Sequence, residues 1–141
     1  MTTDISVQST AYQVENRSWL LGTHGTEPGA TPGITLDIAK FTAGTHFPNG
    51  FIPSGTVLGK VTTGGLYGPY DDAASDGRQT AVGVLFSLVR VTRQNGTNAA
   101  KVGGALYLHG FIKKSRLPFQ SGAGSLDANG IADLKLMSVT D

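Results

Sequence analysis

Alternating apolar and polar positions give the clearest structural signal along this chain. Residues 34–38 alternate Ile, Leu and Ile with Thr and Asp, as in a strand with one buried face. Residues 56–63 and 66–70 are two further candidate strands, separated by a Gly-Gly pair. Residues 80–91 are apolar at both parities, which predicts a strand that is buried on both faces and forms the centre of the fold.

The β pattern continues in the second half of the chain. An Asn-Gly turn and a loop that ends at Gly104 precede residues 105–112, which we expect to pair with the buried strand as a hairpin. Residues 125–137 are ambiguous, because Ser125 can cap a short helix but an Asn-Gly pair interrupts it. Residues 136–140 can form a last strand.

These elements predict a mainly β protein, β-rich α+β in class, with at most one or two short helices. Twenty Gly and six Pro among 141 residues favour turns and short strands over long helices. The length suits one compact domain. We therefore expect a single barrel-like or sandwich-like β domain over residues 34–141, preceded by an extended N-terminal arm over residues 1–33.

The N-terminal arm (residues 1–33) has no periodic pattern. Thr, Ser and Gln are frequent at its start and Gly, Pro and Thr at its end, as in chains with little structure of their own. Its apolar residues Val14, Trp19, Leu20 and Leu21 lie where no periodic element can bury them. We expect them to dock on a partner, since Trp is a frequent binding anchor. Packing back onto the core of the same chain is the alternative.

Charge and composition exclude several classes of function. Eleven Lys and Arg against ten Asp and Glu give a net charge of +1, with no general attraction to nucleic acid or anionic lipid. Residues 90–116 carry six cations and no acid, which we interpret as solvated strand edges. The longest apolar run, residues 81–86, is too short to span a bilayer. We expect neither a nucleic-acid partner nor a membrane. Because no secretory signal pattern follows Met1, we also expect synthesis in the cytoplasm.

Residues able to support catalysis or metal binding are sparse. None of His24, His46 and His109 has a His or carboxylate at i+2 to i+4, the spacing of many metal ligands. The acidic loop at residues 71–77 lacks two oxygen ligands of a calcium loop, and its Asp-Gly pair predicts a tight turn. The chain has no Cys, no nucleophile elbow and no phosphate-binding loop. We therefore expect no enzymatic activity, no metal and no cofactor.

Three consecutive stretches carry a family resemblance: residues 54–62 (SGTVLGKVT), 65–71 (GLYGPYD) and 73–85 (AASDGRQTAVGVL). In this order they resemble the lambda-type bacteriophage head decoration protein family. The resemblance extends loosely over residues 19–137 and opens with an aromatic-x-x-Gly segment at 19–22. The residues that match the family motif, all read as structural, are Gly55, Thr56, Val57, Leu58, Gly59, Asp76 and Gly77.

The resemblance implies a capsid decoration, or cement, protein with no catalytic residues. Such a protein binds as a homotrimer at three-fold sites on the outside of the expanded phage head and stabilises it. Its partners would be the major capsid protein and copies of itself, with Val14, Trp19, Leu20 and Leu21 as candidate capsid contacts. The arm could then add a strand to an edge of the capsid protein. On this interpretation a deletion of residues 1–21 leaves a folded trimer that no longer decorates heads.

Two other kinds of binding protein compete with this interpretation. In the first, Tyr67, Tyr70 and Tyr107 form a stacking platform for carbohydrate or a host surface, displayed on the virion. In the second, the cations of residues 90–116 bind nucleic acid, which the near-zero net charge disfavours. The chain also departs from the family pattern in a longer linker at 94–104 and an insertion at 113–124, so strand order stays open.

Overall fold

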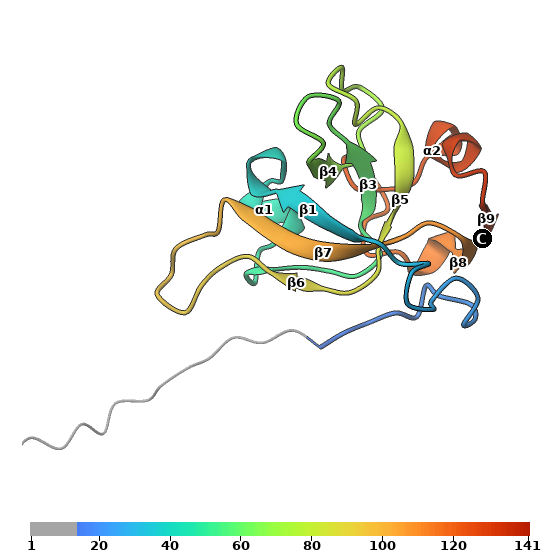
Figure 1. The fold of residues 1–141 in the computed structure, drawn as a ribbon, viewed down its shortest axis with the longest axis horizontal. Coiled ribbons are helices and arrows are strands. Elements are labelled where there is room, and N and C mark those ends of the chain that lie inside the picture. Colours follow the sequence, from blue (N-terminus) through green and yellow to red (C-terminus); the bar gives the residue numbers. More distant parts are fainter. Residues whose placement is uncertain (1–13) are drawn as a thin grey trace, which may run out of the picture.

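Five strands of the computed structural model close into a small barrel (Figure 1). The structure describes residues 14–141, so the first thirteen residues of the arm lie outside it. Strands β1 (Gly33–Asp37) and β4 (Tyr67–Pro69) pair in parallel, and the other neighbours in the barrel are antiparallel. The order around the barrel is β1, β4, β3 (Val57–Lys60), β5 (Ala81–Leu85) and β7 (Lys101–Tyr107).

Two small sheets and four short helical segments complete the described part of the chain. The antiparallel pair is β2 (Phe51–Ile52) with β6 (Val89–Arg90), and the parallel pair is β8 (Gly110–Lys113) with β9 (Met137–Thr140). The α-helices are α1 (Ala43–His46) and α2 (Ala128–Asp133), and the 3-10 turns are η1 (Ile38–Lys40) and η2 (Lys114–Arg116). The expectation of a mainly β, barrel-like domain with two short helices is confirmed.

The apolar residues form two clusters. One lies between the barrel and the β8–β9 sheet with α2, and includes Trp19, Tyr70 and Tyr107. The other lies on the opposite face of the barrel strands, reaches toward β2 and β6, and includes Leu36 and Leu58. The barrel wall is therefore covered by apolar packing on more than one side, which explains why its central strands have few polar residues.

The first three predicted strands are confirmed: β1 is shifted by one residue, and β3 and β4 are shorter than their predicted stretches. Residues 34–38 become β1 with Ile34 and Leu36 buried, and Ile38 is buried at the start of η1. The stretches 56–63 and 66–70 become β3 and β4, which pair as predicted by the turn between them.

The long apolar runs are each divided by a change of direction. Residues 80–91 split into β5 and β6 around the bend at 86–88, so they do not form one continuous central strand. Residues 105–112 divide between β7, which pairs with β5 as expected, and β8, which pairs with β9. β7 begins at Lys101, so Gly103 and Gly104 lie inside a strand and not in a loop. Gly104 faces Leu85, where a Cβ would lie 3.1 Å from the end of the Leu85 side chain, so the packing there is tight.

The helix in residues 125–137 begins two residues later than Ser125 could cap it. Asp127 is the N-cap, and its Oδ1 accepts a 2.7 Å hydrogen bond from the Gly130 amide. Gly130 lies inside the helix because Tyr70 and Leu126 pack directly against it. Close packing therefore outweighs the low helix propensity of the Asn-Gly pair.

Candidate contact surface

The N-terminal segment, defined here as residues 14–32, runs along β8 (Figure 1). Leu20 forms an antiparallel bridge with Ile112. The Leu21 amide donates a 3.2 Å hydrogen bond to the Phe111 carbonyl, and the Lys113 amide donates a 2.8 Å bond to the Trp19 carbonyl. Residues 19–21 thus extend the β8–β9 sheet by one short antiparallel bridge.

Trp19 fixes the N-terminal segment to the core. Its indole is fully buried, and Nε1 donates a 3.1 Å hydrogen bond to the Ser54 hydroxyl. The edge of the indole meets Tyr107, with ring centroids 5.4 Å apart. Gly55 passes so close to the indole that a Cβ there would lie 2.9 Å from it, which gives this motif glycine a packing role.

The placement of Trp19 corrects one expectation. A fully buried indole is not accessible to a partner, so the alternative of packing onto the chain's own core describes Trp19. Leu20 is half-buried against the same cluster. Val14 and Leu21 remain exposed, at 73% and 44%, and stay candidates for contact with another protein.

Glu15 and Arg17 attach the start of the segment to the turn after β5. The Arg17 guanidinium donates 2.8 Å hydrogen bonds to the Phe86 carbonyl and the Ser87 hydroxyl, and lies 4.3 Å from the centre of the Phe86 ring. The Glu15 carboxylate accepts a 3.0 Å bond from the Leu88 amide. Residues 15–21 are therefore held to the domain at both ends.

Three exposed apolar side chains gather beside this segment. They form what we call the apolar face: Leu21, Phe111 and Leu136. Leu21 and Phe111 are backbone neighbours across the segment and β8, and the Gly110 amide bonds the Leu136 carbonyl. An exposed group of this kind is typical of a protein contact.

Sequence reasoning found only one member of the apolar face. Phe111 and Leu136 lie in runs that were assigned to strands, and their exposure depends on which parity faces the core. Ile112 is fully buried, so its neighbour Phe111 must point outward on β8. The alternation along the strand therefore indicates that one of the two neighbours is exposed, but only the fold determines which one.

The family-motif residues have structural positions. Gly55, Thr56, Val57 and Leu58 are buried, and the Leu85 amide donates a 2.9 Å hydrogen bond to the Thr56 carbonyl. Gly59 lies against the backbone of Arg78, where a Cβ would lie 2.6 Å from the Arg78 Cα. The motif thus packs β3 against β5 and against the loop that precedes it.

The Asp76-Gly77 pair makes the tight turn that the sequence predicts. Gly77 has a φ of 116°, and a side chain there would meet the backbone of Lys60 and Thr62. Partial burial acts to raise the Asp76 pKa, but hydrogen bonds from Arg78, through its backbone and side chain, and from Lys40 outweigh it and lower the pKa to about 2. The loop is an ion-paired structural element.

The tyrosines do not form the predicted stacking platform. Tyr70 and Tyr107 are buried and Tyr67 is half-buried, so this basis for a carbohydrate-binding module is wrong. The Tyr70 hydroxyl donates a 2.7 Å hydrogen bond to Asp127 Oδ1. Burial, with this bond and the nearby carboxylates, raises the Tyr70 pKa.

Two histidines that are distant in sequence meet at the edge of the apolar face. His24 Nε2 and His109 Nδ1 lie 3.0 Å apart, whereas His46 is buried elsewhere. Within residues 14–141, no group of three or more His, Cys, Asp or Glu side chains is placed to hold a metal ion. None of the helices described here is long and apolar enough to cross a membrane.

Comparison with protein families places this fold in context. The family model described as Bacteriophage lambda head decoration protein D matches residues 32–139, which include every motif residue and all nine strands except the last residue of β9. The match begins after the aromatic-x-x-Gly segment at 19–22. Neither the curated proteins nor the solved structures gave a match. The chain belongs to the bacteriophage lambda head decoration protein family.

Proposed function

We propose that this protein is a cement protein that binds the outside of the expanded phage head as a homotrimer at three-fold sites. The observation that carries the proposal is the family match over residues 32–139, since this family is structural and decorates phage heads. The barrel and its ion-paired loop then serve as a rigid body, and the contacts with the shell come from outside the motif.

We further propose that the N-terminal arm contacts the major capsid protein. The attachment of residues 15–21 to the domain supports this. A capsid contact made by residues before Val14 would be transmitted to the folded core through the buried indole of Trp19. Val14 and Leu21 are the accessible apolar residues of the segment, and Phe111 and Leu136 extend the contact from the domain itself. Residues 1–13 would add a strand to an edge of the capsid protein.

Weak contacts by single arms suffice in this arrangement. A trimer presents three arms and three apolar faces at once, so the second and third contacts form at a high effective concentration. We propose that the edge that accepts the arm is assembled from neighbouring capsid subunits and is present only in the expanded shell. The protein would then bind the expanded shell alone, and its binding would favour that state. The protein would be made in the host cytoplasm and added to heads there.

Thermal challenge of heads tests the proposed role. DNA-filled heads that lack the protein are heated with and without the purified full chain, and released DNA is measured by nuclease sensitivity. The proposal predicts release at a higher temperature when the protein is present, and no binding to unexpanded procapsids. The pair of variants Leu21→Asp and Thr23→Ala serves as contact change and matched control, since both positions are exposed. DNA release at the same temperature with and without the wild-type chain would refute the proposal.

A further inference from the structure

His24 and His109 form a side-chain pair that the decoration role does not use. Their ring centroids are 4.5 Å apart, with 3.0 Å between His24 Nε2 and His109 Nδ1, and both residues are exposed. His46 differs, because its Nδ1 accepts from the Thr42 amide and its Nε2 contacts the Ala123 carbonyl. Two of the three imidazoles are thus accessible and adjacent.

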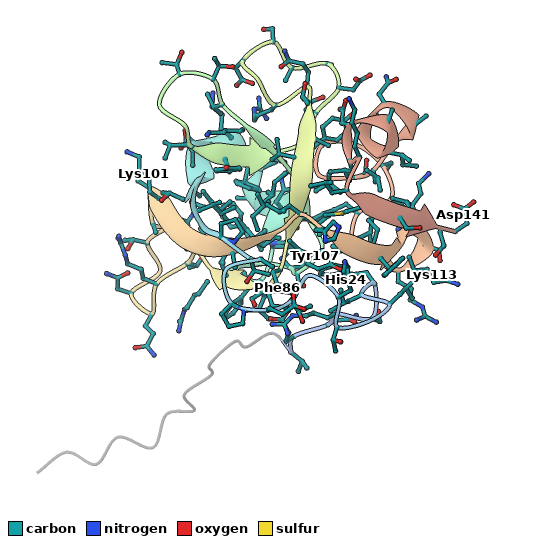
Figure 2. The ribbon with its side chains drawn as sticks, turned by 45° about the vertical axis from the view of Figure 1, so that its right-hand side comes forward. His24, Phe86, Lys101, Tyr107, Lys113 and Asp141 are labelled. Atoms are coloured by element: carbon teal, nitrogen blue, oxygen red, sulfur yellow. The ribbon has the colours of Figure 1, made fainter. Side chains whose placement is uncertain are left out.

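The backbone holds both rings in place. The Tyr107 hydroxyl donates a 2.8 Å hydrogen bond to the His24 carbonyl and accepts a 3.2 Å bond from the Phe111 amide. Gly25 is buried against the His109 carbonyl, at a position where any side chain would clash. Figure 2 shows Phe86, Tyr107 and His24 close together at the end of β7. The backbone on both sides of the pair is therefore fixed, while the two rings stay exposed.

We propose that His24 and His109 together bind one divalent transition-metal ion of the kind that prefers imidazole, such as Zn²⁺, Ni²⁺ or Cu²⁺. Two imidazole nitrogens bound to one such ion at ~2.0–2.1 Å lie roughly 2.9–3.4 Å apart, for angles from square-planar to tetrahedral. The observed 3.0 Å falls in this range. Metal binding would break the hydrogen bond between the rings: the donor ring would move its proton to its other nitrogen, which leaves a free lone pair on both facing nitrogens.

The remaining metal positions open onto a shallow hollow. This hollow has a volume of about 260 Å³ and is lined by the two histidines together with Phe111, Lys135, Leu136 and Ser138. Water would take the free coordination positions there. With two protein ligands and the nearby Lys135 cation, binding is weaker than at a structural zinc site, which has four protein ligands.

The metal would join two elements that are separate in the sequence. His24 belongs to the N-terminal segment and His109 to the turn between β7 and β8, so the ion would tie the base of the arm to the domain. The inference concerns this chain alone and does not depend on the proposed capsid role. It predicts that the metal stabilises the folded protein by binding it in preference to the unfolded chain.

Calorimetric titration of the untagged full-length protein with zinc chloride tests the site. We expect one zinc per chain, and binding about tenfold or more weaker in His24→Ala and in His109→Ala, because each leaves a single ligand. The matched control Thr23→Ala, at the exposed neighbouring position, should bind zinc like the wild type. Circular dichroism confirms that each variant is folded.

Nuclear magnetic resonance of the imidazoles supplies a second readout on the unmodified protein. Zinc should shift the ring signals of His24 and His109, leave those of His46 unchanged, and be reversed by a chelator. The proposal would be overturned by absence of zinc binding or by a stoichiometry other than one zinc per chain. Zinc binding that is unchanged in His24→Ala and in His109→Ala would overturn it too. Shifts confined to other residues would identify adventitious binding and overturn it as well.

Discussion

The indole Nε1 of Trp19 donates a 3.1 Å hydrogen bond to the hydroxyl of Ser54, and both side chains are buried. Ser54 in turn donates to the Phe86 carbonyl, 2.8 Å away. One short chain of hydrogen bonds thus joins the N-terminal segment, the start of the family motif and the turn after β5. This junction makes the N-terminal segment part of the folded domain.

We predict that Ser54→Ala lowers the free energy of unfolding by about 1–3 kcal/mol, because it leaves a buried indole N–H without an acceptor. Trp19→Phe should also destabilise, and the double variant should lose less than the sum of the two. Urea unfolding at fixed protein concentration measures all three. Additive losses would mean that the two side chains do not interact.

The same junction determines how the arm can be removed. We predict that deletion of residues 2–13 leaves a folded protein, whereas deletion of residues 2–21 lowers stability by about 3–5 kcal/mol or prevents folding, because it removes Trp19 from the core. The expectation from sequence that residues 1–21 can be removed without loss of fold is therefore replaced. Circular dichroism and thermal unfolding compare the two deletions. Equal stability of both would contradict the anchoring role of Trp19.

Gly77 and Gly96 provide a matched pair for testing the tight turn. Both have positive φ, but a side chain at Gly77 meets the backbone of Lys60 and Thr62, whereas none of the described atoms lies near a side chain at Gly96. We predict a loss of about 2–4 kcal/mol for Gly77→Ala and about 1–2 kcal/mol for Gly96→Ala. Chemical denaturation measures both. A similar loss at the two positions would remove the steric argument.

Asp76 should contribute to the acid sensitivity of the fold. Its folded pKa of about 2 lies below the ordinary value near ~4, so its contribution is present above pH ~4 and is lost as the pH falls toward 2. Asp76→Asn should therefore reduce stability at neutral pH and flatten the loss between pH ~4 and 2. The exposed C-terminal residue gives the control Asp141→Asn. Chemical denaturation across this pH range measures the stability of both variants. The same pH dependence of stability in the two would contradict the assignment to Asp76.

Local patterns predicted much of the barrel. The alternation in residues 34–38 specified β1, which has one buried face, and the Gly-Gly turn before residue 66 specified the pairing of β3 with β4. The division of residues 80–91 was missed, since apolar residues at both parities do not reveal a bend. The cap at Asp127 was missed because Ser125 offers an equally good oxygen in sequence.

The candidate site was less predictable, because it depends on contacts between distant residues. His24 and His109 are 85 positions apart, so no spacing rule could connect them. For Trp19 the sequence allows either docking on a partner or packing onto the chain's own core. Only the positions of Ser54 and Tyr107 decide that it packs onto the core. Local sequence therefore indicated which residues were unusual, and the fold determined which of them are accessible.

The most direct test of the capsid role is to count bound copies. Purified full-length protein is mixed with undecorated expanded heads of its own phage and sedimented, and the copies per major capsid subunit are measured at saturation. The cement account predicts saturation near one copy per subunit, as trimers at three-fold sites, and loss of binding on deletion of residues 2–13. No binding, or only a few copies per particle, would contradict decoration of the lattice.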